Sequence, residues 1–244
     1  VNGNYGYVIG LEIGLGESRG VLRDLKGSIL AQVRVGASEM LDPEQLVGQI
    51  HYLVDHLLVS GRIKSSKVLG FGIGVSGAVD SENGLVVKSY MLKNSAIPLR
   101  NMLRKHYRYP IYIENDANAG ILCEKWFGHA RDDRDMLYVM LVIDQKVFGI
   151  GYGLILDDRI YRGAHKVAGE SHAHRITIKS MLDEIGDAAE KNVRIGNRSV
   201  DKDQVQLADL LHAAPVRDPV ALKYFEYLGA LLGEELVTIV DLLD

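Results

Sequence analysis

An amide and a carboxylate stand next to each other where one strand of the chain should end. Asn115 and Asp116 follow the β-rich run 109–113 and precede a helical pattern that begins at Ala117. In open α/β sheets, ligands bind outside the carboxyl ends of the strands. The pair offers donors and acceptors that suit a polyhydroxylated ligand, and the carboxylate could also accept a hydroxyl proton. From this stretch alone, the alternative is that Asp116 only caps the helix.

A second group of polar side chains gathers in residues 163–174. Glu170 stands there with His165, His172 and His174. On an extended backbone His172 and His174 would share a face, and neutral imidazoles bind metal ions, so a metal pair is one interpretation. Only Glu170 and His165 could complete its ligand set, so polar contacts to a ligand, or a plain polar loop, are favoured over a metal site.

Two glycine-rich stretches resemble phosphate-binding motifs without their usual context. Residues 72–77 match the Gly-x-Gly-x-x-Gly pattern of dinucleotide-binding folds, but a turn and a strand follow instead of the helix that the motif requires. These glycines are expected to let the backbone approach another group closely. Residues 149–153 precede a strand and could form a phosphate-binding turn, although no Lys and Ser or Thr accompany them.

The elements that must position these residues follow from hydrophobic periodicity and turn signals. A meander of three strands opens the chain, and a helix capped by Asp42 with Pro43 at its first position follows. Strands and helices then alternate, which predicts a mixed sheet flanked by helices, and the chain is expected to be helical from Ser180 on. The strands are expected at 5–12, 18–24, 28–35, 68–75, 85–87, 109–113, 136–143, 151–156 and 159–161, and the helices at 42–60, 98–107, 117–126, 181–192, 204–213 and 219–244.

Composition narrows the class of protein. With 32 acidic and 28 basic residues the net charge is -4, which argues against nucleic-acid binding by this chain, because phosphate neutralisation needs a basic face. No apolar run approaches the roughly 18 residues of a membrane span, so we expect no membrane contact and a cytoplasmic location. The single Cys123 is expected in the core and excludes an intrachain disulfide or a multi-thiolate metal site. The start without Met, and the end within an amphipathic helix, suggest a piece of a longer protein.

Several stretches together resemble the ROK family of sugar kinases and sugar-responsive transcriptional repressors. They lie in the same order and at similar spacing, and they are residues 74–80 with 84–87, residues 113–119, residues 149–153 through 160–164, and residues 168–170. The resemblance implies an α/β, actin-like (ribonuclease H-like) fold with two lobes, mixed sheets and flanking helices. We expect an N-terminal lobe over residues 1–117 and a C-terminal lobe, incomplete at its C-terminus, over residues 118–244.

The resemblance also assigns roles to individual residues. Asn115, Asp116 and Glu170 would hold sugar hydroxyls, and Asp116 matches the catalytic base of the kinases. Gly77 would let the backbone reach the sugar. Either His172 or His174 would take a sugar-contacting role.

The departures from the family pattern lie mainly in the segments that would bind the nucleotide and the metal. The Asp-x-Gly-x-Thr phosphate loop of the kinases is replaced by residues 12–16, in which Glu12 stands for Asp and Gly16 for Thr. Since phosphoryl transfer depends on positioning and charge stabilisation, this loop matters. The second phosphate turn is replaced by Val147-Phe148, the cysteine cluster that binds zinc in the family is missing, and Met91 stands where kinases often carry a sugar-binding Asn.

These observations favour the effector-binding domain of a ROK-type transcriptional repressor, with a sugar or sugar phosphate bound in the cleft between the lobes. Operator DNA would be bound only through a segment absent from this chain, and a homo-oligomer is expected. No cofactor is expected, neither zinc nor another metal. The alternatives are an ATP-dependent hexose kinase, with Asp116 as base and Mg-ATP as co-substrate, and a structural remnant that binds no sugar.

Overall fold

The computed structural model describes residues 2–14, 16–37, 40–89, 91–143, 147–170 and 176–243. Contacts within the chain divide it into two compact units. The first unit contains residues 1–140 and 151–170, and the second contains residues 141–150 and 171–244. This division differs from the boundary expected near residue 117. The helix that follows residue 115 packs on strands of the first unit and therefore belongs to it.

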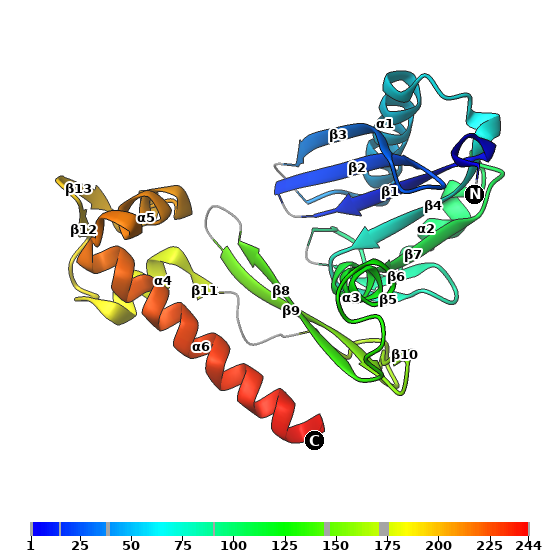
Figure 1. The fold of residues 1–244 in the computed structure, drawn as a ribbon. Helices are drawn as coiled ribbons and strands as arrows, with labels where there is room; N and C mark the ends of the chain where they lie inside the picture. The colour runs from blue at the N-terminus through cyan, green and yellow to red at the C-terminus, as the bar shows by residue number, and fades with distance from the viewer. Residues whose placement is uncertain are drawn as a thin grey trace. The chain divides into compact units, whose positions relative to one another are not determined.

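The first unit is built on a five-stranded mixed sheet (Figure 1). Its strand order is β3-β2-β1-β4-β7; β1 to β3 form the expected antiparallel meander, and β1, β4 and β7 run parallel. The carboxyl ends of the three parallel strands therefore lie at one edge of the sheet. The strands are β1 (Tyr7–Ile13), β2 (Gly16–Asp24), β3 (Ile29–Ala37), β4 (Val68–Val75) and β7 (Ile111–Asn115).

Helix α1 (Pro43–Gly61) covers one face of this sheet. Its start is fixed by a capping box, in which the Asp42 carboxylate accepts from the Gln45 amide at 2.8 Å while the Gln45 side chain accepts from the Asp42 amide at 3.0 Å. Such reciprocal bonds satisfy amides that the first helical turn leaves free. The leucines and isoleucine of its inner face belong to one buried cluster with residues of α2 (Leu99–Leu103), β1, β4 and β7, and this cluster is the core of the unit.

The short elements between β4 and β7 complete the unit, together with the 3-10 helices Gly3–Tyr5 and Ser65–Lys67. β5 (Ala78–Asp80) and β6 (Leu85–Lys88) form a small antiparallel hairpin. Helix α2 ends at Leu103, short of the expected Tyr107. The Tyr107 hydroxyl meets Nδ1 of His51 on α1 at 2.6 Å, and its ring packs on Phe71, so packing of this aromatic side chain ends the helix.

A long hairpin follows α3 (Asp116–Phe127). β8 (Met136–Ile143) pairs with β9 (Val147–Leu156), which turns into β10 (Arg159–Ile160) as expected. Asp157 and Asp158 both have positive φ angles, 50° and 62°, as the tight turn of a hairpin requires. The proposed phosphate turn at residues 149–153 is wrong, because these glycines lie inside β9.

The second unit contains more than the helices expected after Ser180. Helix α4 (Ile178–Ile185) ends at Gly186, well before Asn192, and a hairpin of β12 (Asn192–Ile195) and β13 (Arg198–Asp201) follows. A Gly196-Asn197 turn with φ of 59° at the glycine makes this hairpin possible. The other elements are β11 (Ile176–Thr177), which pairs with β9, the 3-10 helices Lys202–Gln204 and Ala214–Val216, and the helices α5 (Leu207–Ala213) and α6 (Pro219–Leu243). No helix in the described ranges is both long and apolar enough to cross a bilayer.

The core of the first unit provides a test of the fold. Leu53 is fully buried on α1, whereas Val59 on the same helix is 77% exposed. Leu53→Ala should lower the free energy of unfolding by about 3 kcal/mol, because it removes buried methyl groups and leaves a cavity. Val59→Ala should change it by less than about 0.5 kcal/mol. Urea denaturation measures both, and equal effects would contradict the assigned orientation of α1.

Candidate functional site

The candidate site lies at the carboxyl ends of β4 and β7, where the sequence predicts it. β7 ends at Asn115, and α3 begins at the next residue, Asp116. Asn115, not Asp116, is the helix cap: its Oδ1 accepts from the Asn118 amide at 2.9 Å. The alternative in which Asp116 only caps the helix is therefore wrong. Asp116 is the first helical residue, and its Oδ1 accepts from the Ala117 amide at 2.9 Å.

The side-chain amide of Asn115 joins three parts of the first unit. Its Nδ2 lies 3.0 Å from the Gly77 carbonyl, 3.1 Å from Asp116 Oδ1 and 2.9 Å from Glu170 Oε1. An amide group carries two hydrogens, so three acceptors share two donors. Asn115 is buried, with 8% of its surface exposed, and a buried acceptor that lacks a full hydrogen bond is costly. An incoming hydroxyl group could supply the missing donor.

Gly77 occupies a position that only glycine can fill. Its φ angle is +111°, and a Cβ atom there would lie 2.3 Å from the Lys88 carbonyl oxygen. The backbone thus bends sharply after β4, and this bend directs the Gly77 carbonyl to Asn115. The expectation that Gly77 permits a close backbone approach fits this geometry, although the approach observed is to Lys88 and Asn115.

Glu170 reaches the site from the segment that follows β10. It forms an isolated bridge with Gly151 on β9, and the neighbouring Gly169 carbonyl accepts from the Tyr152 amide at 2.9 Å. Gly169 has a φ of +86°, and a Cβ atom there would lie 2.0 Å from the Tyr152 carbonyl oxygen. A second glycine in a left-handed conformation therefore brings the other carboxylate to Asn115.

The two carboxylates share a poorly hydrated environment. Burial raises the pKa of Asp116, hydrogen bonds from the Ala117 amide and the Ser76 side chain oppose this, and the charge of Glu12 raises the pKa again. Burial, followed by the negative charge of Asp116, raises the pKa of Glu170 to about 7. Near neutral pH, Glu170 therefore exists in both forms, so it can donate a hydrogen bond or accept one.

Comparison with known proteins identifies the family. The model of the ROK family matches residues 8–244. The chain belongs to the ROK family.

Curated relatives include two repressors. The chain is 34% identical over 170 residues to a putative xylose repressor of Caldicellulosiruptor sp. (strain Rt8B.4), and 28% identical over 253 residues to the xylose repressor of Bacillus subtilis (strain 168). These alignments cover 70% and 98% of this chain but only 41% and 62% of the two repressors. The ROK chain therefore spans less than two thirds of these relatives.

Solved ROK structures share the fold. A ROK family transcriptional regulator, described as a homolog of the E. coli MLC protein, superposes with a TM-score of 0.77 at 21% identity, over 99% of this chain and 64% of the regulator. A ROK family glucokinase from Streptomyces griseus, in complex with glucose and AMPPNP, gives the same TM-score at 22% identity, over 97% of this chain and 80% of the kinase. The α/β, actin-like fold implied by the sequence resemblance is confirmed.

Other candidates from the sequence lie away from the site or outside the structure. His172 and His174 fall outside the described residues. Met91 is 3% exposed within the core, so it contributes apolar packing, and Cys123, expected in the core, is exposed. Among the described residues, no three His, Cys, Asp and Glu side chains are placed to hold a metal ion.

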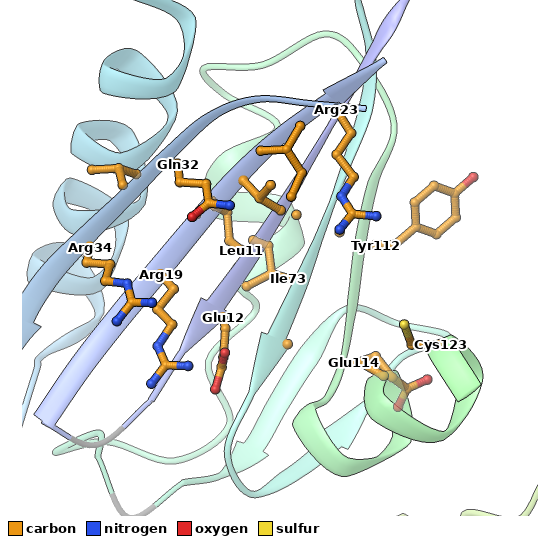
Figure 2. A pocket seen from close by; sticks show the side chains of 18 residues that line it. Leu11, Glu12, Arg19, Arg23, Gln32, Arg34, Ile73, Tyr112, Glu114 and Cys123 are labelled. Atoms are coloured by element: carbon orange, nitrogen blue, oxygen red, sulfur yellow. The ribbon is translucent and has the colours of Figure 1, made fainter. Parts of the chain in front are cut away.

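A cavity of about 610 Å³ lies over the five-stranded sheet, next to the site (Figure 2). Its lining includes three arginines from β2 and β3, together with Glu12 and Glu114 at the strand ends. Figure 2 shows Glu12 near Arg19, which is also its register partner on β2. Arg19 and Arg34 both contact the Glu17 carboxylate, at 2.6 and 3.7 Å. The Glu17 carboxylate therefore offsets part of the positive charge of Arg19 and Arg34.

The geometry of Gly77 can be tested with a matched pair of glycines. Gly77→Ala should lower the free energy of unfolding by roughly 2 kcal/mol or more, because a left-handed conformation is strained for alanine and its Cβ would clash with the Lys88 carbonyl. At Gly72 a Cβ would meet no atom within 4 Å, so Gly72→Ala should be nearly neutral. Chemical denaturation distinguishes the two, and a neutral Gly77→Ala would contradict the bend described here.

The raised pKa of Glu170 predicts a pH dependence of stability. Its folded-state value of about 7 exceeds the 4.5 of an unperturbed glutamate, so the native state holds this proton more tightly. The contribution of Glu170 to stability is therefore greatest below pH 4.5 and is lost as the pH rises through about 7. From about pH 4.5 to 8, wild type should lose roughly 1–3 kcal/mol relative to Glu170→Gln.

The control for this comparison is Glu184→Gln, at an exposed position on α4. Wild type and this control should change in parallel over the same pH range. Urea denaturation at several pH values gives the required free energies. A Glu170→Gln profile parallel to that of wild type would contradict a raised pKa at Glu170.

Proposed function

We propose that this chain is the sugar-binding, effector-sensing domain of a ROK-family transcriptional repressor. The observation that carries the proposal is the convergence of the Asn115 amide, the Asp116 and Glu170 carboxylates and the Gly77 carbonyl at the ends of two parallel strands. Glu170 and Gly77 come from segments far from Asn115 and Asp116 in the sequence. A purely structural cap would need only Asn115.

The chemistry of this group suits a neutral polyol. Each sugar hydroxyl donates one hydrogen bond and accepts others, and the site offers both kinds of partner within one small region. A hydroxyl that donates to Asp116 or Glu170 would relieve the shortage of donors around Asn115. Because Glu12, Asp116 and Glu170 lie near one another, a phosphate group would be repelled, so a free sugar is favoured over a sugar phosphate.

The names of the relatives indicate which sugars to test. Two relatives are described as xylose repressors, and a structural neighbour is described as a complex with glucose and AMPPNP. D-xylose and D-glucose are therefore the first candidates for the ligand of this chain. His172 or His174 would add a contact to the same sugar, as the family resemblance suggests.

Regulation would follow if the sugar prefers one arrangement of the chain over another. Glu170 is the last residue of the first unit, and the chain continues directly into the second. A ligand that binds Glu170 thus acts on the segment that joins the units. Operator DNA would contact a part of the repressor outside these residues, because the net charge of -4 opposes binding to phosphates. Coupling through a homo-oligomer is part of this proposal.

A sugar kinase with Asp116 as base is the second candidate, favoured by the position of Asp116 beside Asn115. It would require Mg-ATP near the turn between β1 and β2. The strands on either side of that turn carry the carboxylates Glu12 and Glu17, which would repel phosphate oxygens, and the Ser18 hydroxyl is fully buried. These carboxylates disfavour a nucleoside triphosphate there, so the kinase remains the second candidate.

Calorimetry with D-xylose and D-glucose tests the proposal on the 244-residue chain. Wild type should bind at least one sugar, and the affinity should be unaffected by Mg-ATP. Asn115→Asp should weaken binding tenfold or more, since it removes the amide donor of the group while keeping an oxygen that can cap α3. Asn101→Ala, at an exposed position on α2, is the control and should bind like wild type.

Two results would overturn the proposal. An absence of heat with any common monosaccharide would favour a structural role for the Asn115 group. Formation of a sugar phosphate from sugar and Mg-ATP by the wild type, and not by Asp116→Asn, would establish the kinase instead.

A further inference from the structure

The segment that carries Glu170 has no hydrophobic anchor. We call residues 161–170 the Glu170 loop. It leaves β9 where the Tyr161 amide donates to the Leu154 carbonyl, and it returns where the Tyr152 amide donates to the Gly169 carbonyl. None of its ten residues is buried. Polar contacts must therefore determine where the loop, and with it Glu170, lies.

One ion pair connects this loop to the strand that carries Asn115. Arg162 Nη2 lies 2.5 Å from Glu114 Oε2, and the two side chains are only 27% and 15% exposed. The other oxygen of Glu114 accepts from the backbone amide of Asn115 at 3.0 Å and from the Asn118 side chain at 3.3 Å. Glu114 thus links Arg162 to the start of α3.

A second ion pair from the loop is weaker. Lys166 Nζ lies 3.6 Å from a carboxylate oxygen of Glu82, whose side chain is 75% exposed. Exposed pairs of this kind contribute little, because water screens them and both long side chains lose freedom. The hydrogen bond between Asn115 and Glu170 is the direct side-chain link from the loop to Asn115, but this bond must be shared with any ligand that uses those groups.

We propose that Arg162 is a positioning residue of the sugar site. Its ion pair with Glu114 holds the Glu170 loop against the start of α3, so that Glu170 stays opposite Asn115 when a sugar hydroxyl replaces their hydrogen bond. This inference rests on the proposed function of the site. It assigns Arg162 no contact with the sugar.

Electrostatics explain why such an anchor is needed. Asp116 and Glu170 are like charges on either side of one amide group, and each disfavours ionisation of the other. When Glu170 loses its proton, repulsion from Asp116 would favour an outward movement of the loop. The guanidinium of Arg162 opposes this movement through its ion pair with Glu114, the residue that precedes Asn115. Glu114 is itself held by hydrogen bonds from Asn115 and Asn118 at the start of α3.

Hydrogen exchange followed by NMR tests the anchor without any ligand. The Tyr152 amide is the reporter, because its hydrogen bond to Gly169 exists only while the loop is docked. Arg162→Met should accelerate its exchange about tenfold or more and leave the amides of β1 and β4 unchanged. Arg162→Lys should restore part of the protection, since the pair uses a single nitrogen of Arg162.

Arg134→Met is the matched control. Arg134 forms an exposed pair with Asp157 at 2.8 Å, in the same unit and outside the loop. Exchange at Tyr152 should be the same in this variant as in wild type. In calorimetry with D-xylose and D-glucose, Arg162→Met should bind at least tenfold more weakly than wild type, Arg162→Lys should recover part of the affinity, and Arg134→Met should bind normally.

The exchange results test whether Arg162 anchors the loop, and the binding results test whether this anchor matters for a sugar site. Unchanged exchange at Tyr152 in Arg162→Met, or equal acceleration throughout the sheet, would overturn the positioning role. Local acceleration with sugar affinity unchanged would also overturn it, because the loop position would then not matter for binding. A wild type that binds neither sugar would overturn the proposed function, and with it the role of Arg162 in a sugar site, whereas the exchange data would still decide whether Arg162 anchors the loop.

Discussion

The side chain of Asn115 is the interaction on which the first unit's functional edge depends. Its oxygen caps α3, and its nitrogen holds the Gly77 carbonyl and two carboxylates from different segments. With two hydrogens for three acceptors, the resting site is short of donors. A ligand rich in hydroxyl groups would supply what is missing, so the residue that stabilises the strand–helix junction is also the centre of the proposed binding site.

Two glycines make this convergence possible by backbone geometry alone. Gly77 and Gly169 both adopt positive φ angles, and both lie so close to a carbonyl oxygen that any side chain would collide with it. Gly77 turns the end of β4 toward Asn115, and Gly169 brings Glu170 back onto β9. Because these approaches involve backbone atoms, flexible neighbours cannot relieve a substitution. The conformations of these turns therefore fix the distances between the polar groups.

Local patterns in the sequence predict the parts of the fold and site that local interactions determine. The Asp42 cap of α1 and the strand-to-helix transition at Asn115 are examples, and both are confirmed. Long-range features could not be predicted in this way. Helix α2 ends early because Tyr107 packs against His51 and Phe71, and the link from Arg162 to Glu114 joins residues 48 positions apart. The hairpin of β12 and β13 was not predicted, although its Gly196-Asn197 turn is a local signal. The helical periodicity expected for this region obscured that turn.

The distribution of charge at the strand ends is the reason why we propose sugar binding, and not phosphoryl transfer, for this chain. Asp116 and Glu170 face one amide donor, and Glu12 adds a third carboxylate nearby. Such a group accepts hydrogen bonds from a neutral sugar but repels the phosphates of a nucleotide unless cations or backbone amides compensate. The raised pKa of Glu170 would be a liability in an enzyme that needed a fully ionised carboxylate there. In a sensor it would add a donor at neutral pH, because the protonated form can donate to a sugar oxygen while the ionised form accepts from a hydroxyl.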